Sequence, residues 1–288
     1  MEFRHILFPV DFSTRSYAVA PQVRAMVERF SSKLTLYHVV ETVPIWAAAG
    51  DGAFVPDLDL SALQADAERR LEKFAEEALP GLTPTRLVEQ GEPATCIAQL
   101  AKAWGADLIM LPTHGHGLFR SALLGSTTSK VLHDADASVW TAAHVEDPAL
   151  QTHLAWNNIV CGIDLLPESV ETLRTADRFA KLSNAKVRLV HAVPGTDVRP
   201  EKYFDQPFEN FLKEYGEKEI ARLQKEAGTG FEVCLEAGNI SQVVRQAAVD
   251  SKADLVLIGR GVARHFAGRL RTHAWSIIRD SPCPVLSL

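Results

Sequence analysis

A short segment between positions 112 and 127 holds the residues best suited to bind phosphate. Gly125, Ser126 and Thr127 precede an apolar helical pattern, so a helix is expected to begin there. The first backbone N–H groups of a helix lack internal partners and lie at the positive end of its dipole, which favours an anion. The two hydroxyl groups can add hydrogen bonds to phosphate oxygens. The alternative is a glycine turn followed by a capping serine.

The same segment holds a glycine–histidine turn. Gly115 and Gly117 allow the backbone to turn sharply and approach a ligand closely, and His116 lies between them. His114 and His116 could be interpreted as a metal pair, but a closed zinc site needs four ligands. We expect no metal site here. The lysine of the P-loop pattern GxxxxGK[ST] is missing, so the segment is not a P-loop.

The elements that position this segment occur twice in the chain. Residues 6–11 resemble residues 159–164, with 164 − 11 = 153. Further on, Gly91 matches Gly238, with 238 − 91 = 147. The shorter second interval indicates an insertion in the first half, which we expect within residues 46–60. Internal repetition at this scale predicts two similar domains.

Each half alternates between strand and helix patterns. Short apolar runs, typical of strands covered on both faces, occupy residues 6–10, 34–39, 85–88, 108–111 and 138–142. The alternation predicts an α/β fold with a doubly wound, mostly parallel sheet in each half. Such sheets bind ligands at the carboxyl ends of their strands, near the switch point of strand order. The pattern breaks at residues 144–156, so we expect domains at 1–146 and 155–288.

Two local expectations concern the first helix of each half and the histidines beside it. Ser13 is a plausible N-cap, whereas Pro21 should fit the helix poorly and kink it. His38 and His191 end apolar strands, and a partly buried, hydrogen-bonded histidine is favoured over a catalytic base. No Ser-His-Asp or Cys-His arrangement has a suitable spacing, so no catalytic residue is assigned.

Composition excludes several classes of protein. The chain has 288 residues, of which 47% are hydrophobic and 23% charged, as in a soluble globular protein. The net charge of −6 disfavours nucleic acid as a partner. No apolar run approaches the roughly 20 residues that span a bilayer, and the start shows no signal peptide. The four scattered cysteines contain no C-x-x-C pair. We expect a cytoplasmic protein without a membrane partner.

The loop resembles the pattern G-x2-G-x9-G-[ST] of ATP-binding universal stress proteins. Gly115, nine intervening residues, Gly125 and Ser126 match it, whereas Pro112 replaces the first glycine. Residues 8–13, Phe-Pro-Val-Asp-Phe-Ser, also resemble the first strand of that family and its aspartate. The resemblance covers nearly the whole chain, twice, so the chain is similar to a tandem two-domain member.

The resemblance implies a five-stranded sheet of order 3-2-1-4-5 in each half. It also implies ATP as the ligand, with ADP and AMP as alternatives and Mg²⁺ accompanying ATP. Asp11 and a backbone group of Val39 would hold the adenosine part, although Asp11 could instead be a capping or turn aspartate. The family pairs its last strands across a dimer interface. Residues 138–142 and 284–288 could therefore form an internal pseudo-dimer, and a further homodimer is left open.

The second half has lost the phosphate pattern. Val262 stands where Gly115 stands, and Arg271 stands where Gly125 stands. These side chains would crowd a pyrophosphate, so we expect ATP only in the first domain. The leading hypothesis is a nucleotide-binding regulatory protein of the stress response that is not an enzyme. One alternative is a slow ATP hydrolase or phosphotransfer enzyme. Another is an interaction module that binds no nucleotide, which Pro112 favours.

Overall fold

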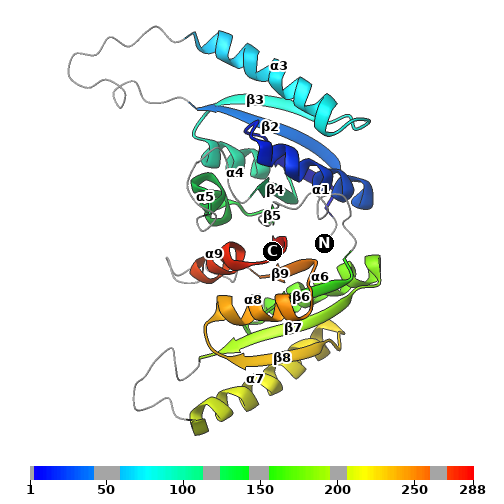
Figure 1. The fold of residues 1–288 in the computed structure, drawn as a ribbon, viewed down its shortest axis with the longest axis vertical. Coiled ribbons are helices and arrows are strands. Elements are labelled where there is room, and N and C mark those ends of the chain that lie inside the picture. Colours follow the sequence, from blue (N-terminus) through cyan, green and yellow to red (C-terminus); the bar gives the residue numbers. More distant parts are fainter. Residues whose placement is uncertain (1–2, 42–58, 113–123, 143–155, 195–205, 260–270) are drawn as a thin grey trace, which may run out of the picture.

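The computed structural model describes residues 3–41, 59–112, 124–142, 156–194, 206–259 and 271–288. Helices and strands alternate throughout these ranges (Figure 1). The first half comprises β1 (His5–Pro9), α1 (Thr14–Phe30), β2 (Lys33–Glu41), α3 (Leu60–Ala78), β3 (Thr85–Gly91), α4 (Pro93–Trp104), β4 (Leu108–Pro112), α5 (Ser126–Asp134) and β5 (Ser138–Ala142). The second half comprises β6 (Asn158–Gly162), α6 (Ser169–Ser183), β7 (Lys186–Val193), α7 (Gln206–Ala227), β8 (Glu232–Ala237), α8 (Ile240–Asp250), β9 (Leu255–Ile258), α9 (Arg271–Asp280) and β10 (Val285–Ser287).

The strands form one ten-stranded sheet in the order β3-β2-β1-β4-β5-β10-β9-β6-β7-β8. The first half therefore has the expected order 3-2-1-4-5, and the second half repeats it in reverse along the sheet. Neighbouring strands within each half are parallel, as the alternation of elements predicts. The expected insertion falls mostly in residues 42–58, outside the described part of the chain.

The two halves join through an antiparallel pair of strands. Within this pair Leu286 lies opposite Trp140, and both side chains are completely buried. Val285 lies opposite Thr141, whose hydroxyl donates to the Val285 carbonyl at 3.3 Å. The expected pairing of the two terminal strands is therefore confirmed. This pairing joins the strands of the two halves into one continuous sheet.

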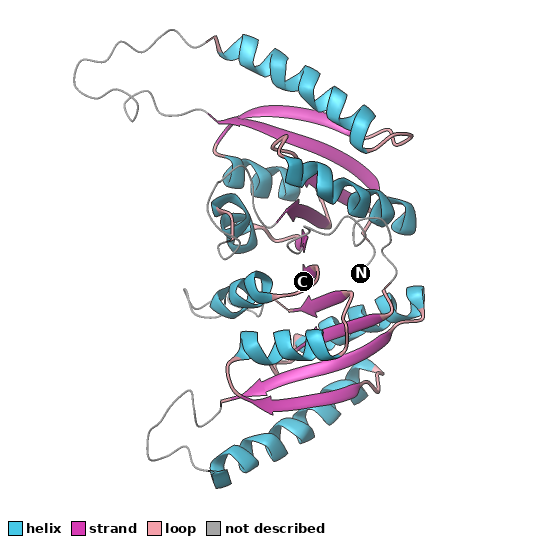
Figure 2. Ribbon diagram, in the orientation of Figure 1, coloured by secondary structure: helices cyan, strands magenta, loops and turns pink. Residues whose placement is uncertain are grey.

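Helices cover both faces of this sheet (Figure 2). The core on one face receives buried side chains from α1, α3, α6 and α7, and the core on the other face from α4, α5, α8 and α9. On the first face Trp156 packs against Phe179 with ring centroids 4.5 Å apart, and the Arg29 guanidinium lies 4.6 Å from the Trp156 ring. On the second face the Trp275 indole of α9 donates to the Ser129 hydroxyl of α5 at 3.2 Å. On both faces of the sheet, side-chain contacts thus cross the boundary between the two halves.

The first helix confirms one local expectation and modifies another. Ser13 caps α1, since its side chain accepts a hydrogen bond from the Ser16 N–H. Pro21 lies inside the helix, which nevertheless runs unbroken from Thr14 to Phe30. Burial of the neighbouring Ala20 and Val23 side chains offsets the backbone hydrogen bond that proline cannot donate. In the described parts of the chain, no helix is both long and apolar enough to cross a membrane.

Candidate functional site

The switch point of the first domain lies between β1 and β4. The chain leaves β1 towards β2 on one side, and β4 pairs with β1 on the other. Asp11 follows β1 directly, and Val39 lies near the end of β2. Because Pro9 is opposite Tyr37 in the parallel register, Asp11 and Val39 come to neighbouring positions at the carboxyl edge of the sheet. This is the edge at which α5 begins.

The start of α5 carries no side-chain cap. Gly125 is its N-cap, with φ −58° and ψ 146°, and as a glycine it offers no side-chain oxygen to the first turn. By contrast, Glu92 at the N-cap of α4 accepts a hydrogen bond from the Thr95 N–H at 2.8 Å. Ser126 is exposed and Thr127 half-buried. The first-turn N–H groups of α5, which lack intrahelical partners, therefore lie at the carboxyl edge, in a turn that includes two hydroxyl-bearing residues.

A buried hydrogen bond fixes α5 to the strand before it. The Thr128 hydroxyl donates to the Pro112 carbonyl at 3.1 Å, and Thr128 is buried. Pro112 is the last residue of β4, opposite Ala142 of β5. The proline that replaces a glycine of the family pattern is thus part of the sheet, where its carbonyl anchors the helix.

The topology brings five of the predicted site residues to one edge of the sheet: Asp11, Val39, Gly125, Ser126 and Thr127. The other two, Gly115 and His116, lie in residues 113–123, outside the described part of the chain, as does His114. Among the described residues, no three His, Cys, Asp or Glu side chains gather to hold a metal ion. The roles of the seven predicted residues stay predictions.

Asp11 closes a tight turn after β1. Its Oδ1 accepts hydrogen bonds from the Ser13 N–H at 2.9 Å and the Ser16 hydroxyl at 2.6 Å. The residue between, Phe12, has a φ of 59°, a left-handed conformation that costs energy in a non-glycine residue. The carboxylate therefore holds a strained turn in place. This agrees with the turn role that is the alternative expectation for Asp11.

The second domain builds the same turn. Oδ1 of Asp164 accepts hydrogen bonds from the Leu166 N–H at 3.2 Å and the Ser169 hydroxyl at 2.8 Å. Leu165 has a φ of 65°, matching the left-handed residue of the first turn. Because the turn occurs in both domains, the aspartate has a structural task that is independent of the phosphate loop.

The two strand-end histidines are also equivalent. Nδ1 of His38 lies 2.7 Å from the Val10 carbonyl oxygen, and Nδ1 of His191 lies 2.8 Å from that of Ile163. Burial lowers the pKa of both rings. The neutral ring, with Nδ1–H donating to the carbonyl, is therefore the form at neutral pH. These contacts agree with the expected hydrogen-bonded, partly buried histidines.

We predict that Asp11→Ala and Asp164→Ala each lower the free energy of unfolding by about 1–3 kcal/mol, because each leaves a backbone N–H and a hydroxyl without their acceptor. Urea denaturation followed by circular dichroism measures both losses. The exposed Glu76→Ala in α3 is the control and should change stability by less than about 0.5 kcal/mol. Unchanged stability in Asp164→Ala would show that the turn does not depend on its carboxylate.

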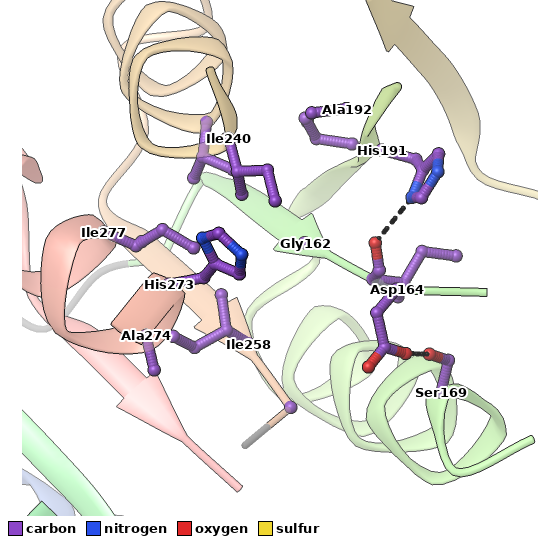
Figure 3. A pocket seen from close by; sticks show the side chains of 14 residues that line it. Gly162, Asp164, Ser169, His191, Ala192, Ile240, Ile258, His273, Ala274 and Ile277 are labelled. Atoms are coloured by element: carbon purple, nitrogen blue, oxygen red, sulfur yellow. Dashed lines mark hydrogen bonds between the residues drawn. The ribbon is translucent and has the colours of Figure 1, made fainter. Parts of the chain in front are cut away.

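A pocket lies at the carboxyl edge of the second domain, at its own switch point between β6 and β9 (Figure 3). Its volume is about 270 Å³. In Figure 3, Ile240 of α8 and Ile277 of α9 project towards it, and the His273 ring lies beside them near Gly162. The remaining lining residues among those that the structure describes are Ile163, Asp164, Ser169, Val190, His191, Ala192, Val244, Ile258, Gly259 and Ala274.

The duplicated sheet and the repeated turns agree with the comparison to protein families. A model described as the universal stress protein family matches residues 2–142 and, separately, residues 155–288. The chain belongs to this family. It is thus a tandem universal stress protein, with one family domain in each half.

Individual relatives agree with this assignment. Universal stress protein A homolog 1 of Coxiella burnetii is 31% identical over 147 residues, which cover 48% of this chain and 95% of that protein. A universal stress protein of Archaeoglobus fulgidus shares the fold over 98% of this chain and 95% of its own, with a TM-score of 0.69 and 19% identity.

Proposed function

We propose that this universal stress protein binds ATP in its first domain and that the bound nucleotide regulates a partner contact in the stress response. The observation that carries the proposal is the start of α5. This helix has glycine at its N-cap and no side-chain cap, and the Thr128 bond to Pro112 holds it against β4. A helix start held in this way at a switch point suits an anionic ligand.

The phosphates would lie against the first turn of α5. The N–H groups of Ser126 and Thr127 and their hydroxyls are the donors, and Gly115 and His116 would complete the loop as the family pattern implies. An anion at a helix start gains about 0.3–1 kcal/mol from the dipole, and up to about 2 kcal/mol when partly buried. Each charge-assisted hydrogen bond adds about 1.5–3 kcal/mol. When Mg²⁺ accompanies ATP, it neutralises part of the phosphate charge.

The adenosine part would lie at the ends of β1 and β2. Oδ1 of Asp11 is engaged in the turn, so the carboxylate reaches the ligand from a fixed position. The backbone of Val39, at the neighbouring position of β2, supplies the second contact. Side chains and backbone groups held by a rigid sheet order a ligand at little cost in their own conformational freedom.

Titration calorimetry of the full chain with ATP, ADP and AMP, with and without Mg²⁺, tests the proposal. We expect saturable binding of one nucleotide per chain. The absence of binding would favour the interaction module instead. A phosphate-release assay on the same protein addresses the hydrolase alternative, for which we expect no turnover above the uncatalysed rate.

A further inference from the structure

We propose that the pocket of the second domain is a separate binding site for an uncharged, two-ring aromatic molecule. The pocket lies at the carboxyl edge between β6, β7 and β9, with α8 and α9 beside it (Figure 3). All the lining residues that the structure describes belong to the second domain. The inference is therefore independent of the ATP site proposed above.

The size of the pocket sets the size of the ligand. An apolar protein cavity of about 150 Å³ holds one benzene ring. The second-domain pocket has a volume of about 270 Å³, which leaves room for two fused rings. Its walls are mainly aliphatic, so burying an apolar ring system there releases water from both surfaces.

The pocket is wide because the strand ends of the second domain carry small residues. Gly162 has no side chain, and a Cβ built on it would meet the Ile258 Cγ2 at 3.3 Å. The repeat distance of 153 residues gives the equivalents in the first domain. At all three strand-end positions the first domain carries a larger residue: Pro9 for Gly162, Tyr37 for Val190 and Val39 for Ala192. The two halves of the chain therefore differ in side-chain size at this edge of the sheet.

The polar groups of the pocket select against an anion. The ends of α5 and α9, Asp134 and Asp280, are 146 residues apart, so His273 and Ala274 correspond to Thr127 and Thr128. The second domain thus lacks two of the three hydroxyl residues that the first domain carries at this helix start, and Thr272 keeps the one equivalent to Ser126. The lining residues that the structure describes include no lysine or arginine, and they do include the Asp164 carboxylate.

The same carboxylate suits a ligand that carries a ring N–H group. Both turn bonds to Asp164 end on Oδ1, and Oδ2 points away from the Ser169 hydroxyl in Figure 3. A donor on the ligand can meet this oxygen, whereas a ligand carboxylate or phosphate would be repelled by it. The His273 ring, at the start of α9, adds a flat face against which an aromatic ring can stack.

Indole and indole-3-carboxylate test this site, because they share the two-ring frame and differ by one negative charge. Isoleucine methyl groups of the 288-residue chain are labelled for NMR, and each of the two compounds is titrated into the protein without nucleotide. We expect indole to shift the Ile240, Ile258 and Ile277 signals saturably, with an apparent Kd of about 1 mM or tighter. Signals of Ile6 and Ile109, in the first-domain core, should stay in place. Indole-3-carboxylate should bind at least about tenfold more weakly.

A pocket-filling variant adds a second, independent measurement. Ala274→Leu places three more carbon atoms against the pocket and should weaken indole binding by about tenfold or more. Ala103→Leu, on an exposed position of α4, is the matched control and should bind as the unaltered protein does.

The proposal is overturned if indole gives no saturable shift, or if the carboxylate binds as tightly as indole. It is also overturned if folded Ala274→Leu keeps full affinity. Should Ala274→Leu not fold, the comparison of the two ligands on the unaltered protein decides.

Discussion

Gly125→Arg should lower the affinity for ATP by about 100-fold or more. The change places a long side chain where the phosphates would meet the first turn of α5, and the loss of two charge-assisted hydrogen bonds alone amounts to about 3 kcal/mol. The backbone tolerates the substitution, since a φ of −58° is open to any residue. The variant should therefore fold, and titration calorimetry can report its affinity directly.

The second domain supplies the matched control. Arg271 already stands at the position equivalent to Gly125, and Thr272 is the equivalent of Ser126. Thr272→Ala should leave ATP binding unchanged. If Gly125→Arg binds ATP as tightly as the unaltered protein while Thr272→Ala does not, the nucleotide site lies in the other half of the chain.

Trp140→Ala should lower the free energy of unfolding by about 3–5 kcal/mol, the largest stability change that we predict. Trp140 is completely buried in β5, opposite Leu286, and its indole N–H donates to the Gln22 Oε1 at 3.0 Å. Its removal leaves a large cavity at the joint between the halves and a buried amide without its donor. Urea denaturation followed by circular dichroism measures the loss.

The control for this variant is a tryptophan outside the core. Trp104, the last residue of α4, is 46% exposed. Trp104→Ala should change stability by less than about 1 kcal/mol. Equal losses in the two variants would mean that burial at the joint between the halves does not set the stability of the protein.

Local sequence patterns were enough to predict most of the fold. The run at residues 138–142 coincides with β5, and the other predicted strands of the first half differ from the structure by one to three residues at their ends. Strands buried on both faces must be apolar along their whole length, so their signal is strong and local. The effect of Pro21 on α1 was harder to predict from the sequence, because the packing that keeps α1 unbroken involves residues from distant parts of the chain.

The second-domain pocket was not predicted from the sequence. The loop sequence shows only what this half has lost, because Val262 and Arg271 stand in place of Gly115 and Gly125. The pocket instead depends on the sizes of side chains that come from separate strands and helices. The sequence does hold a sign of this difference in size. Gly162 and Ala192 are smaller than Pro9 and Val39, the residues 153 positions before them in the first half. A turn role for Asp164 follows from the repeat, because Asp164 is the equivalent of Asp11, but the hydrogen-bond partners of its carboxylate could not be predicted since backbone geometry sets them.

The antiparallel joint between β5 and β10 has a consequence for the synthesis of the protein. The two strands lie side by side, yet the first residue of β10 follows the last residue of β5 by 285 − 142 = 143 positions. At about 5–20 residues per second, a ribosome needs about 7–29 s to cover that distance. During this time the nascent first domain presents an unpaired, apolar strand edge, which favours pairing with other chains. The order of synthesis thus makes the half-finished protein more prone to aggregation than the completed one.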